Sequence, residues 1–251
     1  MYSICLGEAT KVAAYLLDAD KKYRTTVKLG VCTNTGDAEG EVIETRPVGK
    51  ISRDQISKVL ESFTGTISQI PPMHSALKVK GVPLYKLAHQ GIVIERKPRT
   101  VSIFNIEVCG FDGDELELDI HCSKGTYIRV LAEDIGHALG CGGHVQSLYR
   151  YGVGPFKEES IITLDALREL AEQGQAQLDA ALLPIEYAIA DWPEVVLSED
   201  AAYYIRQGQA VFVPRAVTEG WVRLMNQDHF MGVGQILDDG KVAPRKLINT
   251  N

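Results

Sequence analysis

The chain has 251 residues, of which 45% are hydrophobic and 24% are charged, so it can bury a sizeable core and is not intrinsically disordered. A formal net charge of -7 argues against a protein that coats nucleic acid indiscriminately, although a local basic groove is compatible with it. The sequence contains no basic start followed by an apolar run and no long uncharged apolar stretch, so we expect a cytoplasmic protein without a membrane span. Five widely spaced cysteines without a C-x-x-C pair predict reduced thiols.

The spacing of apolar residues predicts the first elements of the chain. Residues 10–17 have the pattern of a short helix, and residues 22–31 alternate with a period of two, which indicates a strand with one buried face. Tyr23 lies on the buried face of that predicted strand. Ser52 followed by Gln55 matches a capping box, which predicts the beginning of an amphipathic helix.

A hairpin and a helix are predicted in the middle of the chain. Apolar and β-branched residues alternate over 101–109 and 115–122, and the Asp-Gly pair between these segments is typical of a hairpin turn. Beyond a turn at 124–125, the apolar residues of 128–139 keep helical spacing. A strand, a turn and a helix in succession are a common place for a functional site.

The remaining pattern sets the predicted fold class. Residues 163–173 read as a helix, residues 174–177 as a loop, and short strands follow from about residue 191. We therefore predict an α+β fold in which a mixed, largely antiparallel sheet is flanked by helices, followed by a small β-rich C-terminal domain. The domain boundary is placed near residue 190, which gives domains at 1–190 and 191–251.

Positive charge is concentrated in two places. Between Met73 and Arg99 the sequence has six lysines and arginines against one glutamate, and the last eleven residues contain Lys241, Arg245 and Lys246 without an acid. Two such patches can follow a phosphate backbone. Basic stretches of this size also occur as ordinary solvated surfaces, so charge alone leaves both interpretations open.

The turn after the predicted hairpin combines three functional groups, because Lys124, Tyr127 and Arg129 lie within six residues. Arginine can pair bidentately with a carboxylate or phosphate, and tyrosine can stack on a nucleobase, so the trio suits a flat anionic ligand. A buried tyrosine and a structurally paired arginine would explain the same pattern. The two isolated pairs of histidine and cysteine are too sparse for a metal centre, so we expect none.

Longer motifs carry a family resemblance. In chain order they are ICLGEATK at 4–11, DKKYRTTVKLG at 20–30, TNTGDAEG at 33–40, IPPMHSALKVKGVPLYKLAHQG at 70–91, ELDIHCSKGTYIRVLAEDIG at 117–136, GCGGHVQSLYR at 140–150 and GVGQILDDGKVAPRKL at 232–247. Over essentially the whole chain they resemble the bacterial TruB family, the tRNA pseudouridine-55 synthases.

The resemblance implies an enzyme, an isomerase that converts uridine 55 in the T-loop of tRNA to pseudouridine without cofactor or metal. Tyr23 would stack on the flipped uracil and take part in proton removal from the product carbon, Tyr127 would shape the pocket, and Leu148 would pack against the base. Arg129 would pair with the catalytic carboxylate and hold it ionised. The implied partner is tRNA, with no protein partner and a monomeric protein.

The C-terminal part from about residue 191 resembles the small RNA-binding module called PUA, which in this family grips the acceptor end of tRNA. The basic residues that the resemblance assigns to phosphate contacts are Lys11, Lys78, Lys80, Lys86, Lys241, Arg245 and Lys246. The alternative for the C-terminal part is a folded cap that only stabilises the catalytic domain.

The sequence departs from the family at its beginning. The family's nucleophile is an Asp in a Gly-rich loop immediately upstream of the segment that begins at Tyr2, so we expect this chain to lack that loop and Arg129 to lack its carboxylate partner. Asp18, Asp20 and Asp37 lie in other motifs, and none is assigned as the nucleophile. Three alternatives follow: a fragment of a tRNA pseudouridine synthase, a non-catalytic tRNA-binding protein, or an inactive truncated product.

Overall fold

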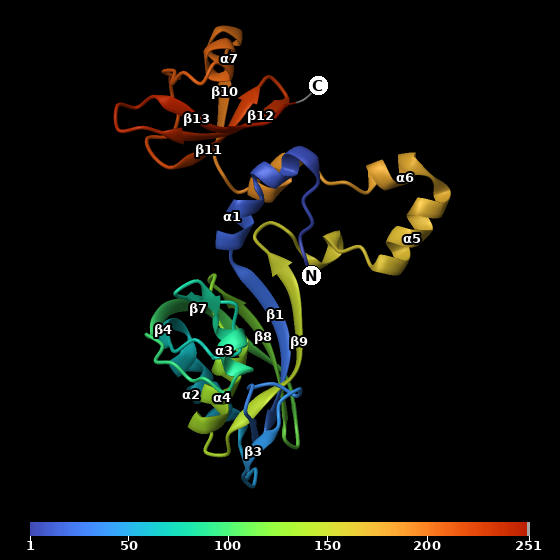
Figure 1. Cartoon of the computed structure of the whole chain (residues 1–251), viewed down its shortest axis with the longest axis vertical. Coiled ribbons are helices and arrows are strands. Elements are labelled where there is room, and N and C mark those ends of the chain that lie inside the picture. Colours follow the sequence, from blue (N-terminus) through green and yellow to red (C-terminus); the bar gives the residue numbers. More distant parts are fainter. Residues whose placement is uncertain (250–251) are drawn as a thin grey trace. The chain divides into compact units, whose positions relative to one another are not determined.

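The computed structural model describes residues 1–249, and the chain forms two compact units (Figure 1). One unit is Asp20–Gly152, and the other joins Met1–Ala19 to the residues from Val153 onward. These units divide the chain at positions other than residue 190, because the N-terminal segment packs with the C-terminal part. The predicted division into 1–190 and 191–251 stays a prediction.

A five-stranded sheet forms the centre of the Asp20–Gly152 unit, in the order β4-β7-β8-β1-β9. Its strands are β1 (Lys21–Leu29), β4 (Gly65–Gln69), β7 (Arg99–Asp112), β8 (Glu115–Cys122) and β9 (Gly143–Val153). The pairs β4/β7, β7/β8 and β8/β1 are antiparallel, which confirms the predicted character of the sheet. The hairpin between β7 and β8 turns at Gly113, whose φ of +61° lies in the region that glycine adopts without strain.

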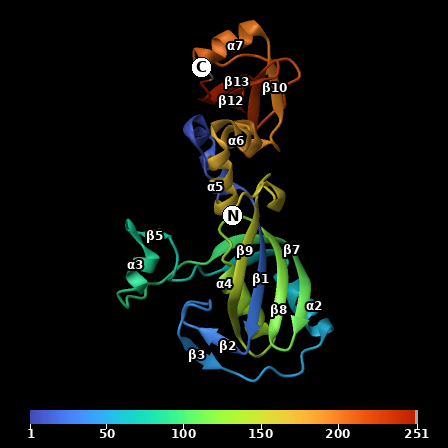
Figure 2. The same ribbon diagram turned by 90° about the vertical axis from the view of Figure 1, so that its right-hand side faces the viewer.

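Two helices cover one face of this sheet, behind the strands in Figure 2. They are α2 (Arg53–Phe63) and α4 (Ile128–Ala138), and their apolar residues form one core with those of β1, β7 and β8. The capping box at the start of α2 is present in both directions, since the Ser52 hydroxyl accepts from the Gln55 N–H and the Gln55 side chain accepts from the Ser52 N–H.

Two short strand pairs lie in this unit beside the five-stranded sheet. The first pair is β2 (Val31–Thr33) and β3 (Val42–Thr45), and the second is β5 (Lys78–Val79) and β6 (Val82–Pro83), followed by α3 (Leu84–Ala88). Strands this short present few apolar side chains to the core.

The other unit contains a second, four-stranded sheet. Its strands are β10 (Glu194–Leu197), β11 (Trp221–Asn226), β12 (His229–Ile236) and β13 (Val242–Leu247), in that order, and α7 (Glu199–Arg206) packs on them. Only β10 and β11 run parallel among these neighbours. This confirms the small β-rich part that the sequence predicts after residue 190.

Helical segments complete the unit: η1 (Gly7–Lys11), α1 (Ala13–Asp18), η2 (Glu158–Ser160), α5 (Leu164–Gln173), α6 (Gln175–Ala180) and η3 (Ile185–Ile189). The loop predicted at 174–177 is wrong, because α6 begins at Gln175, directly after Gly174 breaks the helical path with a φ of +116°. In the described residues no helix is long and apolar enough to cross a membrane.

Candidate active site

The loop between β2 and β3 is folded around the side chain of Asp37. Asp37 Oδ1 accepts a hydrogen bond from the Thr35 hydroxyl at 2.6 Å and another from the Glu39 N–H at 3.2 Å. The Thr33 hydroxyl donates to the Asp37 carbonyl at 2.7 Å, and the Glu41 N–H donates to Asn34 Oδ1 at 3.1 Å. Polar side chains in TNTGDAEG thus replace the apolar contacts that so short a loop cannot make.

This loop is also joined to β9, next to α4. The Val145 N–H donates to the Gly36 carbonyl at 3.0 Å, and the Ala38 N–H donates to the Val145 carbonyl at 3.0 Å. Gly36 has a φ of +74°, and a Cβ there would lie 3.4 Å from the Cβ of Arg129. Glycine therefore lets the loop run close to α4 and brings Asp37 within reach of Arg129.

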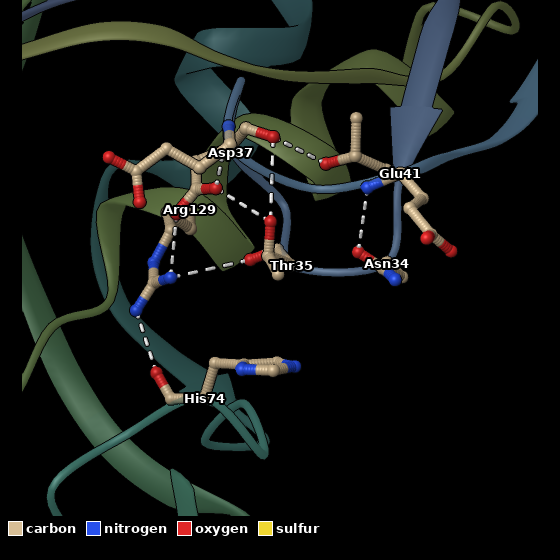
Figure 3. Close-up of polar contacts among 8 residues, drawn as sticks. Asn34, Thr35, Asp37, Glu41, His74 and Arg129 are labelled. Atoms are coloured by element: carbon tan, nitrogen blue, oxygen red, sulfur yellow. Dashed lines mark hydrogen bonds and ion pairs between the residues drawn. The ribbon is translucent and has the colours of Figure 1, made fainter. Parts of the chain in front are cut away.

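Arg129, in the first turn of α4, connects two loops through its guanidinium group (Figure 3). Nη1 lies 2.7 Å from Asp37 Oδ2 and donates to the Thr35 carbonyl at 3.5 Å, while Nη2 donates to the His74 carbonyl at 2.7 Å. The expectation that Arg129 lacks a carboxylate partner is therefore wrong. Sequence reasoning missed Asp37 because the two residues are 92 positions apart.

The carboxyl group of Asp37 is ionised and fully engaged. Partial burial favours the neutral form, but the hydrogen bonds from Thr35 and Arg129 and the charge of Arg129 outweigh it and hold the pKa of Asp37 below its ordinary value. A carboxylate whose oxygens accept bonds from a hydroxyl, a backbone N–H and a guanidinium is a weakened nucleophile. The geometry gives Asp37 the role of orienting Arg129.

Tyr127 caps the beginning of α4 and is held there by Gln69. Gln69, at the end of β4, is 3% exposed. Its Oε1 accepts from the Tyr127 N–H at 3.1 Å, and its Nε2 donates to the Tyr127 carbonyl at 3.3 Å. The N-cap of α4 makes no side-chain cap hydrogen bond of its own, so Gln69 supplies the acceptor for the Tyr127 N–H. Sequence reasoning also missed Gln69, since a lone glutamine carries no motif signal.

Tyr23 lies in β1, opposite Ile120 of β8, and packs against the core as the alternation of the strand predicts. Burial raises the pKa of the Tyr23 phenol, and a nearby Cys122 adds to this, although a hydrogen bond from Arg150 opposes it. Tyr23 is a neutral phenol at neutral pH, as an ordinary tyrosine is, and the raised pKa keeps it so. The expected parts of Tyr23 in stacking on the base and in proton removal stay predictions.

A cavity of about 430 Å³ opens beside Arg129. Its walls are the loop residues 33–36, the segment 70–74, and Arg96, Arg129 and Glu133. Leu148, on β9, is 46% exposed. Of the site residues that the resemblance assigns, Arg129 lines this cavity, whereas Tyr23, Tyr127 and Leu148 are not among its walls. The polar contacts of Arg129 run to Asp37, Thr35 and His74, while that of Tyr23 runs to Arg150.

The predicted phosphate-contact residues differ in their exposure and in whether they pair with other residues of the protein. Lys11 pairs with Glu8 at 2.6 Å and donates to the Leu247 carbonyl at 2.8 Å, and Lys241 pairs with Asp239 at 3.0 Å. Both ammonium groups thus have partners within the protein. The exposed members of the set are Lys78, Lys80, Lys86, Lys241, Arg245 and Lys246, whereas Lys11 is half-buried.

Solved structures define the fold of this chain further. A crystal structure of a Cbf5-Nop10-Gar1 complex is similar over 96% of this chain and 70% of that chain, with 27% identity and a TM-score of 0.73. A structure of an H/ACA RNP bound to a substrate RNA containing 2'-deoxyuridine is similar over 98% and 71%, with 25% identity and a TM-score of 0.72.

Family models match nearly the whole chain, and they place it among the pseudouridylate synthases. Residues 1–128 match the N-terminal domain of TruB family pseudouridylate synthases, residues 129–190 match the C-terminal domain of tRNA pseudouridylate synthase B, and residues 193–248 match the C-terminal part of pseudouridine synthase II TruB. The chain belongs to the TruB family.

Proteins called tRNA pseudouridine synthase B are its relatives in several bacteria. The protein of Nitrosococcus oceani is 54% identical over 246 residues, covering 98% of this chain and 80% of the relative. The protein of Stutzerimonas stutzeri is 49% identical over 249 residues, covering 98% and 81%.

Proposed function

We propose that this protein is a tRNA pseudouridine-55 synthase, which detaches uracil from its sugar at position 55 of the T-loop and rejoins it through carbon. The observation that carries the proposal is the fixed guanidinium of Arg129 at the wall of a cavity, within a chain of the TruB family. Because the product is an isomer of the substrate, the reaction needs no atoms or electrons from a co-substrate.

Tyr23 and Leu148 supply the binding energy for the flipped base. Extruding a base costs a few kcal/mol, and stacking on an aromatic ring contributes about 1–3 kcal/mol per base. Tyr23, hydrogen-bonded to Arg150, stacks on the uracil, and the exposed Leu148 packs against it. We assign to Tyr127, whose backbone is fixed by Gln69, the shaping of the pocket around this base.

Arg129 orients the catalytic carboxylate. The resemblance assigns the nucleophile to an Asp in a Gly-rich loop ahead of Tyr2 in the family, and Arg129 is the residue that this carboxylate would meet. Asp37 and the His74 carbonyl hold the guanidinium in place, so Arg129 is preorganised to orient that carboxylate. Asp37 is thus a positioning residue.

Contacts to tRNA are divided between the two basic patches. Lys78, Lys80 and Lys86 meet phosphates of the T-arm, and Arg245 with Lys246 meets the acceptor end. Separate family models for 129–190 and 193–248 support a domain boundary near residue 190, with an RNA-binding domain beyond it. A monomer is sufficient for this scheme, since all of the proposed contacts come from one chain.

The experiment compares the chain with a chimera that carries, ahead of Tyr2, the residues preceding the matched region in the Nitrosococcus oceani relative. Both are incubated with a tRNA transcript that has uridine at position 55, and pseudouridine is detected by carbodiimide modification and primer extension. Both proteins should bind the transcript, and the chimera should form pseudouridine at that position alone.

Arg129→Lys in the chimera is the decisive variant. One ammonium group cannot replace the two directed bonds to Asp37 and His74, so turnover should fall roughly a hundredfold. Arg168→Lys, on the exposed face of α5, is the matched control and should leave turnover unchanged. If the chimera binds tRNA but forms no pseudouridine, the alternative of a non-catalytic tRNA-binding protein is favoured. If it does not bind tRNA, both the synthase and the tRNA-binding alternative are refuted.

A further inference from the structure

Three aromatic rings meet at the beginning of β11, an inner strand of the C-terminal sheet. Tyr15 of α1 lies 4.8 Å from Trp192 and 5.3 Å from Trp221, measured between ring centroids, and the two tryptophans are 5.8 Å apart with nearly parallel planes, at 28°. Tyr15 and Trp192 are half-buried and pack against a core cluster, whereas Trp221, at the start of β11, is 39% exposed. Trp221 is therefore the outer ring of the group.

The inner rings hold Trp221 in place. The Arg223 Nε donates to the Trp192 carbonyl at 3.0 Å, and Arg223 Nη2 lies 2.9 Å from Glu194 Oε1, which fixes the backbone beneath the stacked pair. A ring supported in this way loses little conformational freedom when a ligand stacks on it. Tyr15 and Trp192 pack against the neighbouring core cluster, and Trp221 is not among its members.

A hydrogen-bonding group and a cation lie beside this ring. Trp221 pairs with Gln235 across β11 and β12, and Gln235 Oε1 accepts a hydrogen bond from Arg245 Nε at 3.0 Å. Arg245 is exposed, so the Nη atoms of its guanidinium can reach a phosphate oxygen. Its charge also acts on Tyr15, where it opposes the effect of burial, which raises the pKa of that phenol.

A flat exposed ring with a guanidinium at its side matches a nucleotide better than it matches an apolar peptide. We propose that Trp221 stacks on an unpaired RNA base while Arg245 binds the adjoining phosphate. Paired bases inside a duplex offer no free face, so the ligand is a single-stranded segment. The proposal rests on the proposed function in one respect, which is that RNA is the polymer this protein meets.

Tryptophan fluorescence gives a direct test. The chain has two tryptophans, so Trp192→Phe leaves Trp221 as the sole emitter while keeping an inner aromatic ring. A short single-stranded oligoadenylate should quench this emission on titration, and a blunt-ended RNA duplex of equal length should not. Loss of one stacked base corresponds to roughly a five- to hundredfold weaker affinity, which is the expected effect of Trp221→Ala.

Matched variants separate stacking from charge and from folding. Trp221→Phe should retain most of the affinity, Arg245→Gln should weaken binding and lower its salt dependence, and Tyr203→Ala, which removes a 57% exposed ring on α7, should change nothing. Equal oligoadenylate affinity in the chain and in Trp221→Ala would overturn the proposal. If both bind tRNA equally, only this inference fails; if neither binds tRNA, the proposed function fails as well.

Discussion

At the scale of single residues, the ion pair between Arg129 and Asp37 explains how two loops share one anchor. Nη1 of the guanidinium binds the Asp37 carboxylate, and Nη2 donates to the His74 carbonyl. Both loops are thus fixed by one side chain from the first turn of α4. The pair is largely shielded, with side-chain exposures of 27% and 22%. Removal of either partner would leave the other charge poorly solvated.

Asp37→Asn should lower the free energy of unfolding at neutral pH by about 1–3 kcal/mol, because Arg129 loses its charged partner. The folded state holds the pKa of Asp37 below its ordinary value, so this contribution is fully present above about pH 4 and is lost as the pH falls through the folded-state pKa. Urea denaturation, followed by circular dichroism at a series of pH values, should show the difference between the two proteins shrinking in acid.

Asp165→Asn provides the control for this measurement. Asp165 also pairs with an arginine at 2.8 Å, but that pair is solvent-exposed on α5, with side-chain exposures of 75% and 86%. Screening by water should leave its removal without a resolvable effect at any pH. Equal effects of the two substitutions would show that shielding does not strengthen the Arg129 pair.

At the scale of elements, the start of α4 depends on a strand that is distant in sequence. Gln69 at the end of β4 satisfies both backbone polar groups of Tyr127, 58 positions later. The helix that carries Arg129 is thereby aligned with the sheet by hydrogen bonds as well as by its apolar face. A small shift of this helix would move the guanidinium relative to the cavity.

Gln69→Met should lower the free energy of unfolding by about 1–3 kcal/mol, because the buried side chain keeps its length but the Tyr127 N–H loses its partner. Hydrogen exchange should accelerate at Tyr127 and in the first turn of α4, which is the readout specific to this contact. Gln146→Met, at an exposed position of β9, should alter neither quantity. Unchanged exchange at Tyr127 would contradict the proposed link between β4 and α4.

Local patterns predicted the elements that depend on neighbouring residues. The alternation of β1, the Asp-Gly turn after β7 and the capping box of α2 are all confirmed, since each is determined within a few residues. The helix α6 was not predicted, because the break at Gly174 was read as the start of a loop. Asp37 and Gln69 were missed because their partners are specified only by the folded chain.

At the scale of the whole molecule, the exposed basic residues belong to both compact units. Of the predicted phosphate contacts, Lys78, Lys80 and Lys86 lie in the Asp20–Gly152 unit, and Lys241, Arg245 and Lys246 lie in the other. The overall charge of -7 confines favourable phosphate contacts to such patches. If one tRNA meets both patches, the electrostatic contributions of the two units add in the binding free energy.

Salt dependence measures how many phosphates each patch contacts, because each neutralised phosphate releases counterions. Arg245→Gln combined with Lys246→Gln should reduce the slope of log K against log salt by about 1–2 for tRNA, and so should Lys78→Gln combined with Lys80→Gln. All four changes together should reduce it by the sum. Lys58→Gln, an exposed position of α2, should leave the slope unchanged.

An isolated T-arm hairpin distinguishes the roles of the two units. It lacks the acceptor end, so only the changes at Lys78 and Lys80 should reduce its slope, while the changes at Arg245 and Lys246 should have no effect on it. Equal effects of both double variants on the hairpin would mean that the C-terminal patch meets the T-arm itself. If the changes at Arg245 and Lys246 left the slope of log K against log salt for full-length tRNA unchanged, the C-terminal sheet would stabilise the protein without contacting a phosphate.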